Sequence, residues 1–103
     1  MINKKLKDIA IRKASKSICK YKVSAIGLDK NFRIVAVKCN RPRFSWVGGS
    51  IHAEIQLMKY PNVKTIIICR INNSGKIKPI SPCKVCKEKA NELGIKILTI
   101  KEN

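Results

Sequence analysis

A run of eight residues near the middle of the chain, "KTIIICRI" at 64–71, most limits the folds that this sequence can adopt. The run is nearly all apolar and does not alternate, which predicts a central strand buried on both faces of a sheet. Such a sheet needs a covering layer on each side, and helices are the usual cover in α/β proteins. The rest of the sequence must therefore supply helices for two faces.

Three other segments have helical character. They are residues 3–19, 52–60 and 81–94. The first places apolar residues at helical spacing and leaves a basic outer face. Ser50 is a plausible N-cap for the second helix, which Pro61 stops. The third begins at a Ser-Pro pair and ends at Gly94, which are start and stop signals.

The remaining segments read as strands and connections. Strands are predicted at 21–29, 32–40, 64–71 and 95–100, and 41–50 is expected to be a loop. The turn composition between the first two strands predicts an antiparallel hairpin. The β-α-β-α-β order that follows predicts parallel neighbours joined by right-handed crossovers. We expect one domain, 1–103, folded as a three-layer α/β/α sandwich with a mixed sheet and the hairpin at one edge.

The charge of the chain indicates what kind of partner it binds. Lysine and arginine number 23 and aspartate and glutamate 6, which gives a net charge of +17. Such a field attracts polyanions, so nucleic acid is the first expectation and a phosphorylated small molecule the second. No apolar run approaches the ~18–20 residues that span a bilayer, and the charged N-terminus lacks a secretory signal. We therefore expect no membrane partner and a cytoplasmic location.

Five cysteines separate into two groups. An odd number in an intracellular context argues against a disulfide framework. Cys19, Cys39 and Cys69 lie in apolar or strand-like settings and are expected to be small buried hydrophobes. Cys83 and Cys86 differ, because they form a Cys-x-x-Cys pair at the start of a predicted helix.

The single histidine gives that pair a partner. His52 opens the second predicted helix, and two thiolates with an imidazole suit Zn²⁺. Three protein ligands leave a fourth position for water, as in a catalytic zinc site. Glu54 follows His52 by about 200° of helical rotation, so both are not expected to hold one metal. The carboxylate is instead suited to general acid–base work, with a structural role at the helix N-terminus as its alternative. A redox role for Cys83 and Cys86 would leave His52 and Glu54 without a function.

Together these residues form a recognisable double motif. His-x-Glu occurs at 52–54 and Pro-Cys-x-x-Cys at 82–86, a combination typical of zinc deaminases. The chain resembles the cytidine deaminase-like superfamily, which includes cytidine, deoxycytidylate and tRNA adenosine deaminases, over nearly its whole length. The resemblance implies Zn²⁺ as cofactor and hydrolytic deamination at C4 of cytosine or C6 of adenine, with Glu54 moving the protons.

The resemblance also implies residues that contact the substrate. "CNRP" at 39–42 is similar to the Asn-Arg-Pro of tRNA adenosine deaminases, which implies that Asn40 binds the sugar of the substrate. The backbone around Ala53 would contact the base. The segment 74–88, "SGKIKPISPCKVCKE", is more similar to cytidine deaminases. The two likenesses therefore favour different bases, and Asn40 as a simple turn residue stays open.

The predicted loop 41–50 carries further candidates. Phe44 and Trp46 are suited to stack on a base while Arg41 and Arg43 hold phosphate. The two aromatic residues would otherwise anchor the loop on the domain.

Three functions follow in order of support. The first is deamination of cytosine to uracil in a nucleoside, a nucleotide or single-stranded DNA or RNA. The second is deamination of adenosine in tRNA. The third is an inactive zinc-containing module that binds nucleic acid, against which the intact Glu54 argues. The chain ends soon after 95–100, where many relatives continue, so a compact form with a truncated C-terminus is expected. A homo-oligomer remains open, since relatives are often dimers or tetramers.

Overall fold

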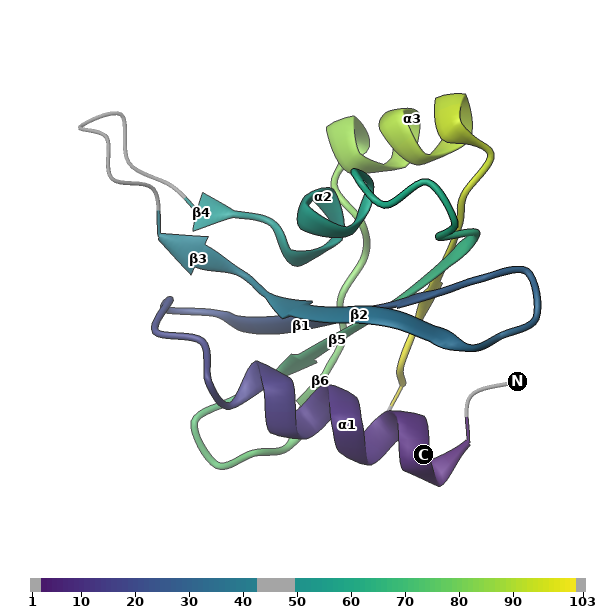
Figure 1. Cartoon of the computed structure of the whole chain (residues 1–103). Helices are drawn as coiled ribbons and strands as arrows, with labels where there is room; N and C mark the ends of the chain where they lie inside the picture. The colour runs from purple at the N-terminus through teal and green to yellow at the C-terminus, as the bar shows by residue number, and fades with distance from the viewer. Residues whose placement is uncertain (1–2, 43–49, 102–103) are drawn as a thin grey trace.

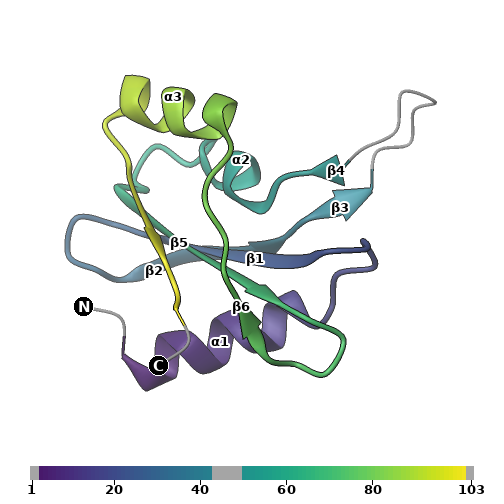
Figure 2. The ribbon, with the colours of Figure 1, turned by 180° about the vertical axis from the view of Figure 1, so that it is seen from behind.

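The helices of the protein lie on both faces of one sheet. The structure, a computed structural model, describes residues 3–42 and 50–101. Helix α1 (Lys4–Ala14) covers one face, and α2 (Ala53–Leu57) and α3 (Lys84–Leu93) cover the other (Figure 1). The view from behind shows the same two layers of helices around the sheet (Figure 2). The predicted three-layer α/β/α architecture is confirmed.

The main sheet is mixed and has five strands. They are β1 (Lys22–Leu28), β2 (Ile34–Cys39), β5 (Thr65–Ile71), β6 (Ile77–Lys78) and β7 (Lys96–Thr99). The order is β2-β1-β5-β6, and β7 also pairs with β5. The predicted central strand is confirmed, because β5 has β1 on one side and both β6 and β7 on the other. The hairpin of β1 and β2 forms one edge of the sheet, as expected.

The pairing of β5 corrects one part of the predicted topology. Among the strands of 3–42 and 50–101, β7 alone is both parallel to β5 and paired with it. Strand β2 is separated from β5 by β1, which is antiparallel to both. The first hairpin strand therefore occupies the interior of the sheet and has a run of buried residues, whereas β2 is partly exposed along its length. The crossover through α2 thus passes over β1 instead of joining parallel neighbours.

Several predicted boundaries also change. Helix α1 ends at Ala14 instead of residue 19, and Ile18 beyond it is 82 % exposed. The expected loop 41–50 contains two short strands, β3 (Arg41–Pro42) and β4 (Ser50–Ile51), which pair antiparallel. The prediction of Ser50 as a helix N-cap is therefore wrong, since this residue is in a strand.

Two buried clusters join the layers. On one face, apolar residues of α1 pack on alternate residues of β1 and β5, including Ile26, Ile67 and Cys69. On the other face, α2 and α3 pack on the intervening residues, including Ile66 and Ile68. Because β5 contributes to both clusters, its uninterrupted apolar sequence has a direct structural cause. Within 3–42 and 50–101, none of the helices has the length and apolar character needed to cross a membrane.

Candidate metal centre and pocket

Two helix starts bring three metal-ligating side chains together. His52 is the N-cap residue of α2, and Cys83 is the N-cap residue of α3. The Nδ1 atom of His52 lies 3.3 Å from Sγ of Cys86 and 3.4 Å from Sγ of Cys83. The two sulfur atoms are 3.0 Å apart. All three donor atoms lie within 4.8 Å of one another, so residues more than thirty positions apart in sequence form one group.

Packing and capping hold this group in place. Ala53 of α2 and Cys86 of α3 are buried, so the first turn of each helix is packed into the protein interior. The Sγ atom of Cys83 accepts a hydrogen bond from the backbone N–H of Cys86 at 3.3 Å, which closes the first turn of α3. Two sulfur donors and one imidazole nitrogen match the ligand types of a zinc site with one open position. The donor set therefore fits Zn²⁺.

The environment of Cys86 favours its protonated form when no cation is present. Burial raises the pKa of its thiol most, followed by the hydrogen bond with Cys83 and the negative charge of Glu54. A metal that binds here must displace these protons, so the binding energy of the metal offsets the cost of holding two thiolates together.

Glu54 lies beside the three donors. Its side chain is buried, and its Oε1 atom is 3.7 Å from Nδ1 of His52. The expectation that a rotation of about 200° separates these two side chains is wrong, because His52 precedes the helix in an extended conformation, with φ −66° and ψ 144°. Glu54 is nevertheless outside the group of mutually close donors. The carboxylate is thus placed to exchange protons next to the candidate metal.

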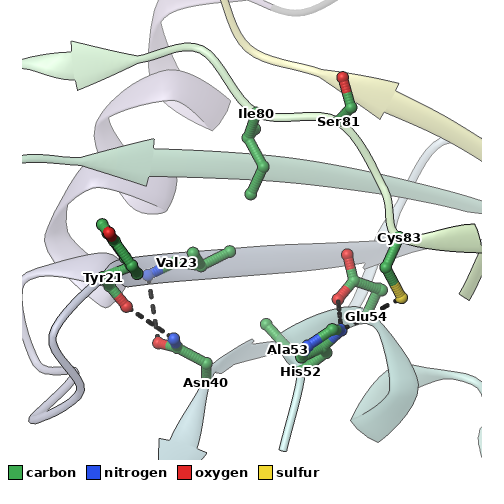
Figure 3. Close-up of a pocket in the computed structure, with 9 residues that line it drawn as sticks. All are labelled: Tyr21, Val23, Asn40, His52, Ala53, Glu54, Ile80, Ser81 and Cys83. Carbon is green, nitrogen blue, oxygen red and sulfur yellow. Dashed lines mark hydrogen bonds and ion pairs between the residues drawn. The ribbon is translucent and has the colours of Figure 1, made fainter. Parts of the chain in front are cut away.

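A pocket of about 180 Å³ opens at this group. Its lining residues are Tyr21, Val23, Asn40, His52, Ala53, Glu54, Ile80, Ser81 and Cys83. Figure 3 shows His52, Glu54 and Cys83 together at one end of the pocket, and Tyr21 and Asn40 together at the other. The pocket therefore joins the candidate metal centre to the end of β2.

Asn40 is held rigidly at its end of the pocket. Its Oδ1 atom accepts hydrogen bonds from the Ser17 hydroxyl at 2.6 Å and from the Val23 N–H at 3.1 Å. Its Nδ2 atom donates to the Tyr21 carbonyl at 2.7 Å (Figure 3). An amide nitrogen has two hydrogens, so one remains after this bond. The network ties the end of β2 to the segment before β1.

The other predicted substrate residues have different outcomes. Ala53 lines the pocket between its two ends, where its backbone was expected to contact a base. Arg41 lies in β3 and is exposed. Arg43, Phe44 and Trp46 lie outside the residues that the structure describes.

Sequence reasoning missed four lining residues, namely Tyr21, Val23, Ile80 and Ser81. Ile80 and Ser81 directly precede the Pro-Cys motif, and that adjacency was a usable signal. The sequence contains no such signal for Tyr21 and Val23, because these residues reach the pocket only through the pairing of β1 with β2 and β5.

The five cysteines are all free thiols, as expected. Cys69 is fully buried, which confirms its prediction as a small hydrophobe. Cys19 and Cys39 are half-buried, so the same prediction is correct for them only in part.

Comparisons with known proteins place the fold. No family model matches the chain, and no curated protein matches it. Among solved structures, a mutant cytidine deaminase from Mycobacterium tuberculosis matches with a TM-score of 0.63 and 16 % identity. The match covers 98 % of this chain and 87 % of that one. At this identity the likeness concerns the fold. The chain thus has a cytidine deaminase fold and a His/Cys/Cys group at two helix starts, which fits the cytidine deaminase-like superfamily that its motifs resemble.

Proposed function

We propose that this protein is a zinc-dependent hydrolytic deaminase that converts a cytosine base to uracil. The observation that carries the proposal is the position of the buried Glu54 carboxylate beside the donors His52, Cys83 and Cys86, at one end of a pocket. A site that served only to hold a structural metal would need a fourth protein ligand and no buried carboxylate next to it.

The thiolates of Cys83 and Cys86 and the imidazole of His52 would hold Zn²⁺ and leave one position for water. Zinc bound in this way would supply Lewis acidity, which lowers the pKa of a water molecule toward neutrality. Helix α3 assists, because the positive end of its dipole favours negative charge on Cys83 and Cys86.

Glu54 carries the protons in this proposal. Its carboxylate would carry one proton of the attacking water to ring nitrogen N3 and the second to the amino group, so that the C4–N bond breaks, ammonia leaves and the ring keeps a C4 carbonyl and an N3–H. The carboxylate is shielded from bulk solvent, so a proton on it passes to the substrate more readily than to surrounding water. Its position at 3.7 Å from His52 keeps it next to the reacting atoms without making it a ligand.

The remaining residues orient the base and the sugar. Ala53 lines the pocket, and in this proposal its backbone would contact the base. The free Nδ2 hydrogen of Asn40 would bind a sugar hydroxyl, because its other hydrogen bonds already fix the amide. We assign stacking and phosphate contacts to Phe44, Trp46, Arg41 and Arg43 as further parts of the same proposal.

The likeness of the Ser-Pro-Cys segment to cytidine deaminases supports cytosine over adenine, and so does the name of the matching structure. Five free thiols suit a reducing compartment, so we propose that the protein acts in the cytoplasm. Adenosine in tRNA is retained as a competing substrate on the strength of Asn40, Arg41 and Pro42.

The first prediction tests this function directly. We expect about one zinc per chain by elemental analysis and loss of the substrate amino group by mass spectrometry. The substrate panel comprises cytidine, cytidine and deoxycytidine monophosphates, single-stranded DNA, adenosine and tRNA. We expect Glu54→Gln to keep its zinc and to lose at least about a thousandfold in rate, because the ligands survive and the proton carrier does not.

Cys69→Ala is a matched control, since it alters a buried residue on the opposite face of the sheet and should retain both zinc and activity. A folded protein that binds no zinc, or a Glu54→Gln variant as active as the natural protein, would contradict the proposal. Conversion of adenosine alone would replace cytosine by adenine.

A further inference from the structure

Three residues form a row across the sheet directly beside the pocket. Val23 of β1 pairs with Arg70 of β5, and Arg70 pairs with Lys78 of β6. Paired residues on neighbouring strands project from the same face of a sheet. Val23 also lines the pocket, so Arg70 is the cross-strand neighbour of a lining residue and Lys78 is the next residue in the row.

The alternation along β5 identifies the face on which this row lies. Ile66 and Ile68 pack in the cluster under α2 and α3, whereas Ile67 and Ile71 pack in the cluster under α1. Arg70 is in phase with Ile66 and Ile68, so its side chain lies on the face that carries α2, α3 and the pocket. Lys78 shares this face. It lies two residues before Ile80, which also lines the pocket.

Arg70 also contacts the pocket lining itself. The centre of its guanidinium group lies 4.5 Å from the ring centroid of Tyr21, a residue at the end of the pocket far from the metal group. The ammonium of Lys20 lies 5.7 Å from the same ring. A guanidinium held against an aromatic ring keeps its planar edge of N–H donors free, and that edge matches the oxygens of a phosphate.

Among the residues that the structure describes, these cations have no counter-charge. In residues 3–42 and 50–101, the ion pair that the structure shows is His52 with Glu54. Arg70 and Lys78 are half-buried and lie beside one another without a carboxylate within 4 Å in the described part of the chain. Two adjacent cations repel each other, so an anion bound between them would be stabilised by both.

We propose that Tyr21, Arg70 and Lys78 form a phosphate-binding site at the outer end of the pocket, so that the substrate is a phosphorylated form of the nucleoside. This inference rests on the proposed function and specifies its substrate. It rests on the arrangement around the pocket: His52, Cys83 and Glu54 lie at one end and Asn40 and Tyr21 at the other (Figure 3). Arg70 lies against the Tyr21 ring, and Lys78 is paired with Arg70 in the sheet. A nucleotide in this arrangement has its base at the metal, its sugar at Asn40 and its phosphate on the cations.

The shared chemistry is a phosphate attached to the sugar of the cytosine. It can come from a free mononucleotide or from a single strand of nucleic acid, and the same N–H donors would serve both. The exposed ring of Tyr21 adds a surface on which a neighbouring base of a strand can stack.

The first experiment compares deamination of cytidine, cytidine monophosphate and a short single strand with one cytosine. We expect the zinc-loaded protein to show kcat/KM at least about tenfold higher for a phosphorylated substrate than for cytidine. Arg70→Gln should reduce that preference about tenfold. Lys59→Gln is the matched control, because it also removes a cation over a tyrosine, with Nζ 5.6 Å from the ring of Tyr60, and should keep the preference.

A preference for the mononucleotide and a preference for the strand both support the site and identify the source of the phosphate. Equal kcat/KM for cytidine and both phosphorylated substrates would overturn the proposal. So would an Arg70→Gln variant that retains the full preference, or one that loses no more of it than Lys59→Gln does.

Binding separates failure of this site from failure of the proposed function. Calorimetry with cytidine monophosphate and fluorescence anisotropy with the labelled single strand need no turnover. Arg70→Gln should weaken both about tenfold and reduce the salt slope of strand binding by about one, whereas Lys59→Gln should not. If no substrate is deaminated but these binding effects occur, the phosphate site stands and the enzymatic proposal fails. If deamination occurs without them, the phosphate site fails alone.

Discussion

Asn40 combines a structural role with the proposed contact to sugar, and unfolding measurements can isolate the first. Its amide is the shared partner of the Ser17 hydroxyl, the Val23 N–H and the Tyr21 carbonyl. We expect Asn40→Ala to lower the free energy of unfolding in urea by about 2–4 kcal/mol, because it leaves these polar groups without partners.

Ser17→Ala provides the control, since it removes one of these bonds and should cost about 1–2 kcal/mol. The double variant should lose less than the sum of the two, as expected for residues of one network. A loss below about 1 kcal/mol for Asn40→Ala would show that water replaces the amide and that the network is not structural.

Cys69 makes stability depend on pH in the alkaline range. Burial raises the pKa of its thiol from 9.0 to about 11, although the positive charge of Lys7 opposes the shift. The folded state therefore keeps this proton in a range where the unfolded chain loses it, so its stabilising contribution is complete below pH 9 and declines as the pH rises toward 11.

We expect the difference in unfolding free energy between the natural protein and Cys69→Ala to shrink by about 2 kcal/mol between pH 8 and pH 11. Comparing the two proteins at each pH cancels the titration of lysines. A difference that stays constant with pH would show that this thiol titrates normally.

Those residues of the candidate site that belong to short sequence motifs could be predicted from the sequence. His52, Cys83 and Cys86 could be assigned to one metal because their spacing and helix-start context are visible in the sequence. The short distance between His52 and Glu54 could not be predicted, because it depends on His52 lying before the helix. Tyr21 could not be predicted as a site residue either, since strand pairing alone brings it to Asn40 and Arg70.

At the scale of elements, helix α3 has a weak hold on the rest of the molecule. Only Cys86 and Ala90 of its ten residues are buried. Because one of these is a candidate ligand, zinc would stabilise the helix by joining its start to that of α2. We expect amide hydrogen exchange of α3 to quicken at least about tenfold when a chelator removes zinc, with a smaller change in β1 and β5.

Cys86→Ser should make the exchange of α3 insensitive to zinc, whereas Cys19→Ser, at a half-buried thiol outside the donor group, should keep the full response. Exchange in α3 that is the same with and without zinc would mean that packing of Ala90 and its neighbours is sufficient to hold the helix.

The elements themselves differ in how far sequence predicted them. The long, strongly apolar β5 was predicted to within one residue, and α3 was predicted to end at Gly94, because burial and the Gly94 stop signal act locally. The predicted start of α3 at 81 is wrong, since the helix begins at Lys84 with Cys83 as its N-cap. Helix α1 was overestimated, since the residues after Ala14 turn away to place Ser17 against Asn40. The short strands β3 and β6 form because they pair with a neighbouring strand, and a two-residue sequence pattern cannot predict such pairing.

For the whole molecule, the topology shows where sequence order ceases to be informative. The order of helices and strands predicted the layers correctly, since each helix must cover one face of the sheet. It did not predict that β1 would lie between β2 and β5. A hairpin can join a sheet through either of its strands, and the choice depends on packing over both faces at once.

The net charge gives the last prediction, which concerns the stability of the entire chain. With 23 basic and 6 acidic residues, and His52 with Glu54 as the ion pair within 3–42 and 50–101, repulsion among cations opposes the compact state. Salt shortens the range of this repulsion, from about 30 Å at 0.01 M to about 10 Å at 0.1 M. We therefore expect the melting temperature to rise as sodium chloride is raised from about 0.01 M to 0.1 M.

Replacing the exposed Lys4, Lys5 and Arg12 of α1 by glutamine should raise the melting temperature at low salt and flatten its dependence on salt. A melting temperature that falls with salt would show that favourable charge contacts outweigh the repulsion. In that case the lysines and arginines would stabilise the folded protein through their own contacts, and no bound polyanion would be needed to reduce their mutual repulsion.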